Sequence, residues 1–120
     1  MTVITFDKPI ASYQMVQDLL AQMMVDAEAA RLLVYKAGFV KNQGERSTIE
    51  VSTAKYYATE VGVKASNVAL QMLGAAGYMQ DHLTELYYRD AKQLTIVEGT
   101  SQVQLGLIAR GVLAHDLWWD

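Results

Sequence analysis

Apolar residues recur every three to four positions along most of the chain, which is the period of an amphipathic α-helix. The first such run follows Pro9, a residue that suits the first turn of a helix, and it extends to Lys41–Gly44, where glycine can adopt the left-handed conformation that ends a helix. We therefore predict a first helix of roughly eight turns. Its apolar stripe comprises Tyr13, Val16, Leu20, Met23, Met24, Ala27, Ala30, Val34 and Ala37.

A second long helix is predicted to begin at Ser47-Thr48-Ile49-Glu50. This segment matches a capping box, in which the serine hydroxyl and the glutamate carboxylate each bind an unpaired backbone amide. The connection to the first helix is too short for anything but antiparallel neighbours. The stripe of the second helix is rich in small side chains that allow close approach of another helix: Ala54, Tyr57, Ala58, Val61, Ala65, Val68, Ala69 and Met72.

The helical pattern breaks at Gly74–Gly77, where we predict a turn before a shorter helix from about residue 84 to residue 94. After Glu98 and Gly99, either Thr100 or Ser101 could cap a last short helix. No segment shows the sustained alternation or the Asn-Gly turn of a β-hairpin. The sequence thus predicts an all-α fold of four helices, in a single domain spanning residues 1–120.

Composition excludes several classes of protein. The 120 residues are 52% hydrophobic and 19% charged, which suits one folded domain, and polar residues interrupt the uncharged stretches too often for a membrane span. Met1 is not followed by a signal peptide, and the absence of cysteine is compatible with a reducing cytoplasm. The net charge of −3 and the scattered Lys and Arg residues disfavour nucleic acid as a partner. We expect a soluble, cytoplasmic protein.

Local sequence gives only weak signals of chemistry. His82 and His115 are far apart and neither lies at metal-ligand spacing with another ligand, so no metal site is predicted. Glu98 immediately precedes a helix start, where the helix dipole stabilises an anion, and taken alone this position favours a structural role.

The first helix carries more apolar surface than a small bundle can cover, which predicts self-association or packing against a partner domain. The tail Leu117-Trp118-Trp119 is compatible with the same interpretation, and equally with packing on its own bundle. The additional apolar residues of the first helix are Met15, Leu19, Leu32, Leu33 and Phe39.

Residues 71–110 contain four motifs in a specific order. They are Gln-x-x-Gly-x-x-Gly-Tyr from Gln71, Tyr-Arg-Asp-Ala-Lys from Tyr88, Glu-Gly-Thr-Ser-Gln from Glu98, and Ile-Ala-Arg ending at Arg110. Together they resemble the C-terminal region of the flavin-dependent acyl-CoA dehydrogenases, and residues 6–14 resemble the segment that opens the first helix of that domain. The resemblance implies an up-down four-helix bundle. It also implies that the family's N-terminal helical domain and middle β-domain are not part of these 120 residues.

The resemblance also implies roles for individual residues. Glu98 occupies the position of the base that removes the α-proton of an acyl-CoA while the β-hydride passes to flavin N5, and its backbone amide helps to stabilise the developing enolate. Such a base works in a dry apolar pocket, for which Ile96 and Val97 are suitable lining. Gly99 allows the chain to approach the substrate closely.

The cofactor implied by the resemblance is FAD, held between two chains of a homodimer or tetramer, with electron-transfer flavoprotein as the electron acceptor. The positions that match its binding segments are Phe6, Tyr13, Gln14, Gln71, Gly74, Ala75, Thr100, Ser101 and Gln102.

Three positions depart from the family pattern. Val3 stands where the family often has an arginine that pairs with the FAD pyrophosphate, Ala75 where it commonly has glycine, and Leu86 where it usually has a basic residue. The resulting hypothesis is the C-terminal domain of an acyl-CoA dehydrogenase, inactive in isolation. The alternatives are a non-catalytic helical assembly module and the small subunit of a split, hetero-oligomeric dehydrogenase.

Overall fold

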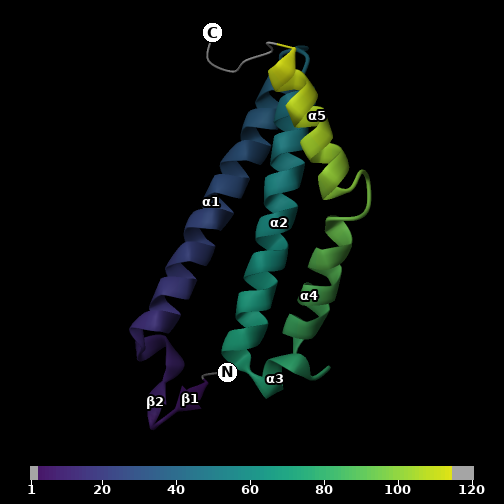
Figure 1. Cartoon of the computed structure of the whole chain (residues 1–120). Coiled ribbons are helices and arrows are strands. Elements are labelled where there is room, and N and C mark those ends of the chain that lie inside the picture. Colours follow the sequence, from purple (N-terminus) through teal and green to yellow (C-terminus); the bar gives the residue numbers. More distant parts are fainter. Residues whose placement is uncertain (1–2, 115–120) are drawn as a thin grey trace.

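The computed structural model describes residues 3–114, and these form an all-α fold arranged around one central helix (Figure 1). Helix α2 (Thr48–Leu73) is flanked on one side by the antiparallel α1 (Gln14–Asn42). Helices α4 (Leu83–Leu94) and α5 (Ser101–Leu113) follow one another along its other side. The predicted all-α class and the antiparallel α1–α2 pair are confirmed. The predicted glycine turn contains an additional short helix, α3 (Ala75–Tyr78).

The start of the chain differs from the prediction. Two short strands, β1 (Ile4–Thr5) and β2 (Lys8–Pro9), pair in an antiparallel hairpin. The sequence does not predict this hairpin, because its turn is Phe6-Asp7 instead of Asn-Gly, although both turn residues take the positive φ that a tight hairpin needs, 51° and 60°. Pro9 then precedes a 3-10 turn, η1 (Ile10–Ser12), so the long helix begins later than Pro9.

The predicted boundaries at Gly44 and Thr100 are confirmed, and the one at Ser47 is partly wrong. Gly44, with φ of 76°, follows the end of α1, and Thr100 caps α5 by accepting a hydrogen bond from Val103 N at 3.3 Å. Ser47 is the N-cap of α2, but its side chain makes no capping hydrogen bond, so the predicted capping box does not form. Its ψ of 19° lies outside the extended region that an N-cap usually adopts.

Small side chains bring the helices together. The buried apolar residues are Ala30 and Ala37 of α1 with Ile49 and Ala54 of α2. Gly111 of α5 lies against Ile49 so closely that a Cβ at position 111 would overlap the isoleucine side chain. The small-residue stripe predicted for the second helix therefore does allow close helix contact.

A polar contact joins α1 to α2 beside this core. Lys64 Nζ donates to Asp26 Oδ2 at 2.7 Å, and Tyr57 OH donates to Asp26 Oδ1 at 3.3 Å. The Lys64 hydrogen bond holds the pKa of Asp26 below its ordinary value, and Asp26 in turn raises the pKa of Lys64.

Much of the apolar surface stays exposed. Val25, Leu32, Tyr35 and Phe39 of α1 are 67%, 65%, 66% and 66% exposed, and their spacing of seven, three and four residues places them on one face. We call these four residues the α1 stripe. The tail 117–119 and His115 lie outside the described residues. None of the helices within residues 3–114 combines the length and apolar character needed to cross a bilayer.

Candidate active site at the α4–α5 junction

Glu98 lies in the connection between α4 and α5, which curves outward on the side away from α2 in Figure 1. Its φ is +54°, and the φ of Gly99 is +91°, so two successive residues are left-handed. This conformation costs a glutamate about 1–2 kcal/mol and costs a glycine little. The Glu98 side chain is exposed, as are Ile96 and Val97. The connection therefore presents a carboxylate from a strained backbone, a feature that concentrates at functional sites.

Side chains from α2 and α5 hold the backbone of this strained segment. Lys55 Nζ donates to Leu94 O at 2.8 Å and to Gly99 O at 2.7 Å. From the other side, Gln104 Nε2 donates to Glu98 O at 3.4 Å and to Gly99 O at 3.3 Å. A Cβ at position 99 would lie 2.6 Å from Nε2 at the flexible end of Gln104, which would have to shift, and the φ of +91° is the main reason that this position favours glycine.

The two ends of the connection are also joined directly. Ser101 N donates to Thr95 O at 3.0 Å, and both residues are buried. Ser101 Oγ donates to Glu60 Oε1 of α2 at 2.6 Å. The Ser101 hydroxyl is thus turned toward α2, whereas Gln102, the next residue of α5, is exposed.

Four of the predicted cofactor residues meet at a different place. Phe6, Tyr13, Gln14 and Gln71 line a largely apolar hollow of about 500 Å³ between the N-terminal hairpin, the start of α1 and the end of α2. Tyr13 OH donates to Thr5 O at 3.0 Å, which ties the hairpin to the start of α1.

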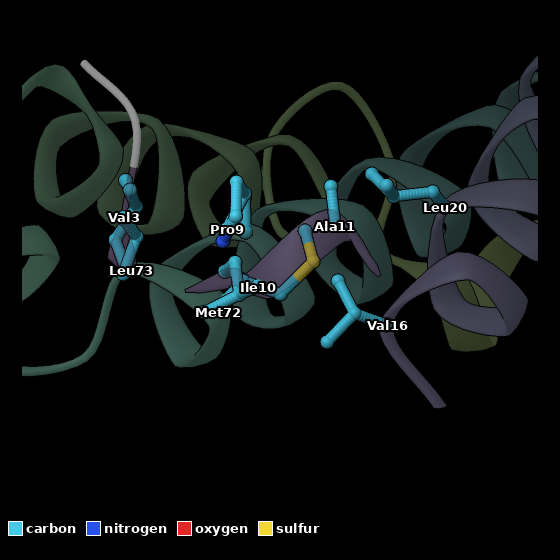
Figure 2. Close-up of a pocket in the computed structure, with 9 residues that line it drawn as sticks. Val3, Pro9, Ile10, Ala11, Val16, Leu20, Met72 and Leu73 are labelled. Atoms are coloured by element: carbon cyan, nitrogen blue, oxygen red, sulfur yellow. The ribbon is translucent and has the colours of Figure 1, made fainter. Parts of the chain in front are cut away.

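A second hollow of about 360 Å³, drawn in Figure 2, shares Ile10, Val16 and Met72 with the first and so lies at the same end of the molecule. Its lining is apolar and includes Val3, Ile10, Met72 and Leu73. Val3 therefore contributes an apolar side chain to the lining, at a position where the family often has an arginine. Gly74 follows directly after Leu73, with φ of 60°, and leads into α3 at Ala75.

The predicted site residues thus form two separate groups. Lys55, which contacts Gly99, and Gln71, which lines the larger hollow, lie roughly 24 Å apart along α2 at 1.5 Å of rise per residue. Glu98, Gly99, Thr100, Ser101 and Gln102 form the first group. The second group comprises Phe6, Tyr13, Gln14, Gln71, Gly74 and Ala75 near the hairpin end.

Lys55, Gln104 and Glu60 were not predicted as site residues from the sequence. The only signal for Lys55 was a charged residue directly beside the small-residue stripe of the second helix, next to Ala54. Without knowing that the end of α4 lies against this part of α2, that signal also describes an ordinary surface lysine.

The structure defines an all-α domain that presents one carboxylate from the connection between two helices and carries an apolar hollow at one end. Residues 1–113 match the family model described as "Acyl-CoA dehydrogenase, C-terminal domain". The chain belongs to this family.

Individual relatives agree with the family match. The chain is 44% identical over 108 residues to a 3-(aryl)acrylate reductase of Clostridium sporogenes, covering 90% of the chain and 29% of the relative. It is 39% identical over 109 residues to a cyclohexane-1-carbonyl-CoA dehydrogenase of Geobacter metallireducens, covering 91% and 29%. The butyryl-CoA dehydrogenase structure from Megasphaera elsdenii superposes with a TM-score of 0.90 at 36% identity, covering 92% of this chain and 29% of that one. The chain thus spans less than a third of the length of these relatives.

Proposed function

We propose that this chain supplies the catalytic base and part of the FAD-binding surface of an acyl-CoA dehydrogenase. The reaction is the α,β-dehydrogenation of an acyl-CoA thioester. The observation that carries this proposal is Glu98 itself, an exposed carboxylate on a left-handed backbone that Lys55 and Gln104 hold in place.

The chemistry assigns two functions to Glu98. Its carboxylate accepts the α-proton of the acyl group, and the hydride that leaves the β-carbon completes the oxidation to a double bond. FAD, when bound, supplies the acceptor for that hydride. Within residues 3–114 the Glu98 N–H makes no hydrogen bond, so it is available to donate to the thioester oxygen as negative charge develops there.

The residues around the larger hollow fit part of a flavin cofactor. Gln14 and Gln71 are exposed amides at the edge of an apolar hollow that Phe6 and Tyr13 also line, a combination that suits an aromatic ring with polar substituents. In the first group, Thr100 and Gln102 lie at the positive end of α5, where an anionic or polar cofactor group is favoured. The Ser101 hydroxyl donates its proton to Glu60, so its contribution to a cofactor is as an acceptor.

Another polypeptide segment is needed to complete the pocket. Ile96 and Val97, the suggested lining near the base, are 57% and 37% exposed, whereas proton abstraction from a weak carbon acid requires water to be excluded. We therefore propose that a helical domain and a β-domain of the same dehydrogenase, together with a second copy of this chain in a dimer or tetramer, close the site. Electron-transfer flavoprotein is the proposed electron acceptor.

The direct test is Glu98→Gln in the flavin-loaded dehydrogenase that contains this chain. We expect the rate of flavin reduction by acyl-CoA, measured anaerobically by absorbance, to fall by about a hundredfold or more, because general-base catalysis contributes about 10²–10⁴-fold. Flavin content and acyl-CoA binding should not change. Glu45→Gln, an exposed glutamate in the α1–α2 connection, is the matched control. An undiminished rate in Glu98→Gln would refute the proposal.

A second candidate function is a helical assembly module without catalysis, for which the exposed α1 stripe would be the contact surface. Under it, the chain associates without flavin in any combination of partners, and Glu98→Gln changes nothing. The small subunit of a split dehydrogenase would instead co-purify from its native host with a larger flavin-carrying chain.

A further inference from the structure

We propose that Lys55 is a positioning residue that holds the Glu98–Gly99 backbone in its left-handed, catalytically useful conformation. This inference rests on the proposed function of Glu98 as the base. It adds a residue of α2 that makes no direct contact with the reacting atoms in the proposed mechanism.

The two hydrogen bonds of Lys55 join the ends of the connection. Leu94 is the last residue of α4, so its carbonyl has no partner within that helix, and Gly99 immediately precedes the cap of α5. One ammonium group at 2.8 Å and 2.7 Å from these two carbonyl oxygens therefore fixes the span of the segment that carries Glu98. A cation at the C-terminal end of α4 also interacts favourably with the dipole of that helix.

The strained backbone explains why such a clamp is needed. A glutamate left to itself favours right-handed or extended backbone over a φ of +54°. A segment with this preference changes to one of those conformations unless surrounding contacts hold it in the strained one. Lys55 makes the shortest of the side-chain hydrogen bonds to the Gly99 carbonyl, and Gln104 supports it from α5 at 3.3 Å.

The test compares three lysine variants in the flavin-loaded dehydrogenase that contains this chain. In Lys55→Met we expect the rate of flavin reduction at saturating acyl-CoA to fall about tenfold to a hundredfold, because a misplacement of about 1 Å can cost about 10² in rate. The dissociation constant of acyl-CoA and the flavin content should stay unchanged. Lys55→Arg, which keeps a cationic donor, should recover part of the rate.

Lys64→Met is the matched control, since Lys64 is on the same helix and its Nζ binds Asp26 of α1 instead of the connection. It should reduce flavin at the unaltered rate. A general loss of folding would also lower flavin content and acyl-CoA affinity, whereas loss of positioning lowers only the rate.

Hydrogen exchange of the amides of residues 95–101 in the chain itself gives a second readout. Lys55→Met should speed exchange at the Ser101 amide, which donates to Thr95 O across the connection, and Lys64→Met should not. If Lys55→Met does not assemble with flavin, Gln104→Met provides the alternative variant, because it removes the other side-chain donor to Gly99 O. It should likewise lower the rate of flavin reduction without changing the affinity for acyl-CoA.

Two kinds of failure can be distinguished. If Glu98→Gln abolishes the reaction but Lys55→Met behaves like Lys64→Met in rate and in exchange, Glu98 remains the base and the positioning role is refuted. If Glu98→Gln leaves the rate unchanged, the proposed function fails, and the inference about Lys55 fails with it.

Discussion

At the scale of single residues, Glu98 combines a cost in stability with a suggested gain in function. It has a positive φ, its side chain is exposed, and the structure shows no hydrogen bond of its carboxylate within residues 3–114. The fold therefore gains nothing visible from having glutamate at this position. A strained residue with no structural benefit supports the proposal that the side chain serves a ligand.

The strain makes a prediction about stability. Replacing Glu98 with asparagine, which tolerates left-handed backbone, should raise the free energy of unfolding by about 0.5–1 kcal/mol. Denaturant unfolding of the chain followed by circular dichroism measures the change. Glu45→Asn, in which the replaced residue has no positive φ, should show no such gain. A loss of stability in Glu98→Asn would mean that the glutamate side chain makes a stabilising contact.

At the scale of helices, α2 organises the molecule because it contacts α1, α3, α4 and α5. Its contact with α5 depends on the absence of a side chain at Gly111, which makes room for Ile49. The same contact brings α5 and the Glu98 connection alongside Lys55 and Glu60. The position of α5 along α2 therefore also sets the position of the Glu98 connection relative to Lys55 and Glu60.

Two glycines of α5 offer a matched test of this contact. Gly111→Ala should lower the free energy of unfolding by about 1 kcal/mol or more, since overpacking costs about 1–3 kcal/mol and outweighs the gain in helix propensity. Gly106→Ala should raise it by about 0.5–1 kcal/mol, because nothing lies within 4 Å of an added Cβ there. Thermal or denaturant unfolding distinguishes them. Equal effects at the two positions would show that the α2–α5 contact tolerates a methyl group.

At the scale of the whole molecule, the described residues leave one face of α1 without a partner. The α1 stripe is about two-thirds exposed at each of its four positions, and it continues along the side of α1 with the regular spacing of a helix–helix contact. The proposed dehydrogenase and the proposed assembly module both require such a surface to be covered, so its occupancy does not distinguish them.

The stripe predicts self-association of the chain. The double variant Leu32→Gln with Phe39→Gln should weaken the association by about tenfold or more, because a central apolar or aromatic contact is typically worth more than about 1 kcal/mol. Sedimentation equilibrium over a concentration series measures the effect. Tyr87→Gln, an exposed aromatic on α4, is the control. A chain that stays monomeric at every concentration would exclude the stripe as a contact between copies.

The sequence by itself predicted the four longer helices and pointed to Glu98 as the candidate base. Apolar periodicity and the glycines at 44 and 74 are local signals, and so are the threonine cap of α5 and the motif around Glu98, because each depends on residues within a turn or two of one another. The hairpin at Phe6-Asp7 was missed because its positive φ values occur without the residues that usually favour them.

Only the tertiary structure decided what holds the base. Lys55 is 44 positions from Gly99 and Glu60 is 41 from Ser101, so no pattern along the chain connects them. They meet because small residues allow α5 to lie close to α2, which brings the end of α4 and the start of α5 against the same helix face. Long-range contacts of this kind depend on the packing of several helices at once, whereas periodicity reports only which face of each helix is apolar.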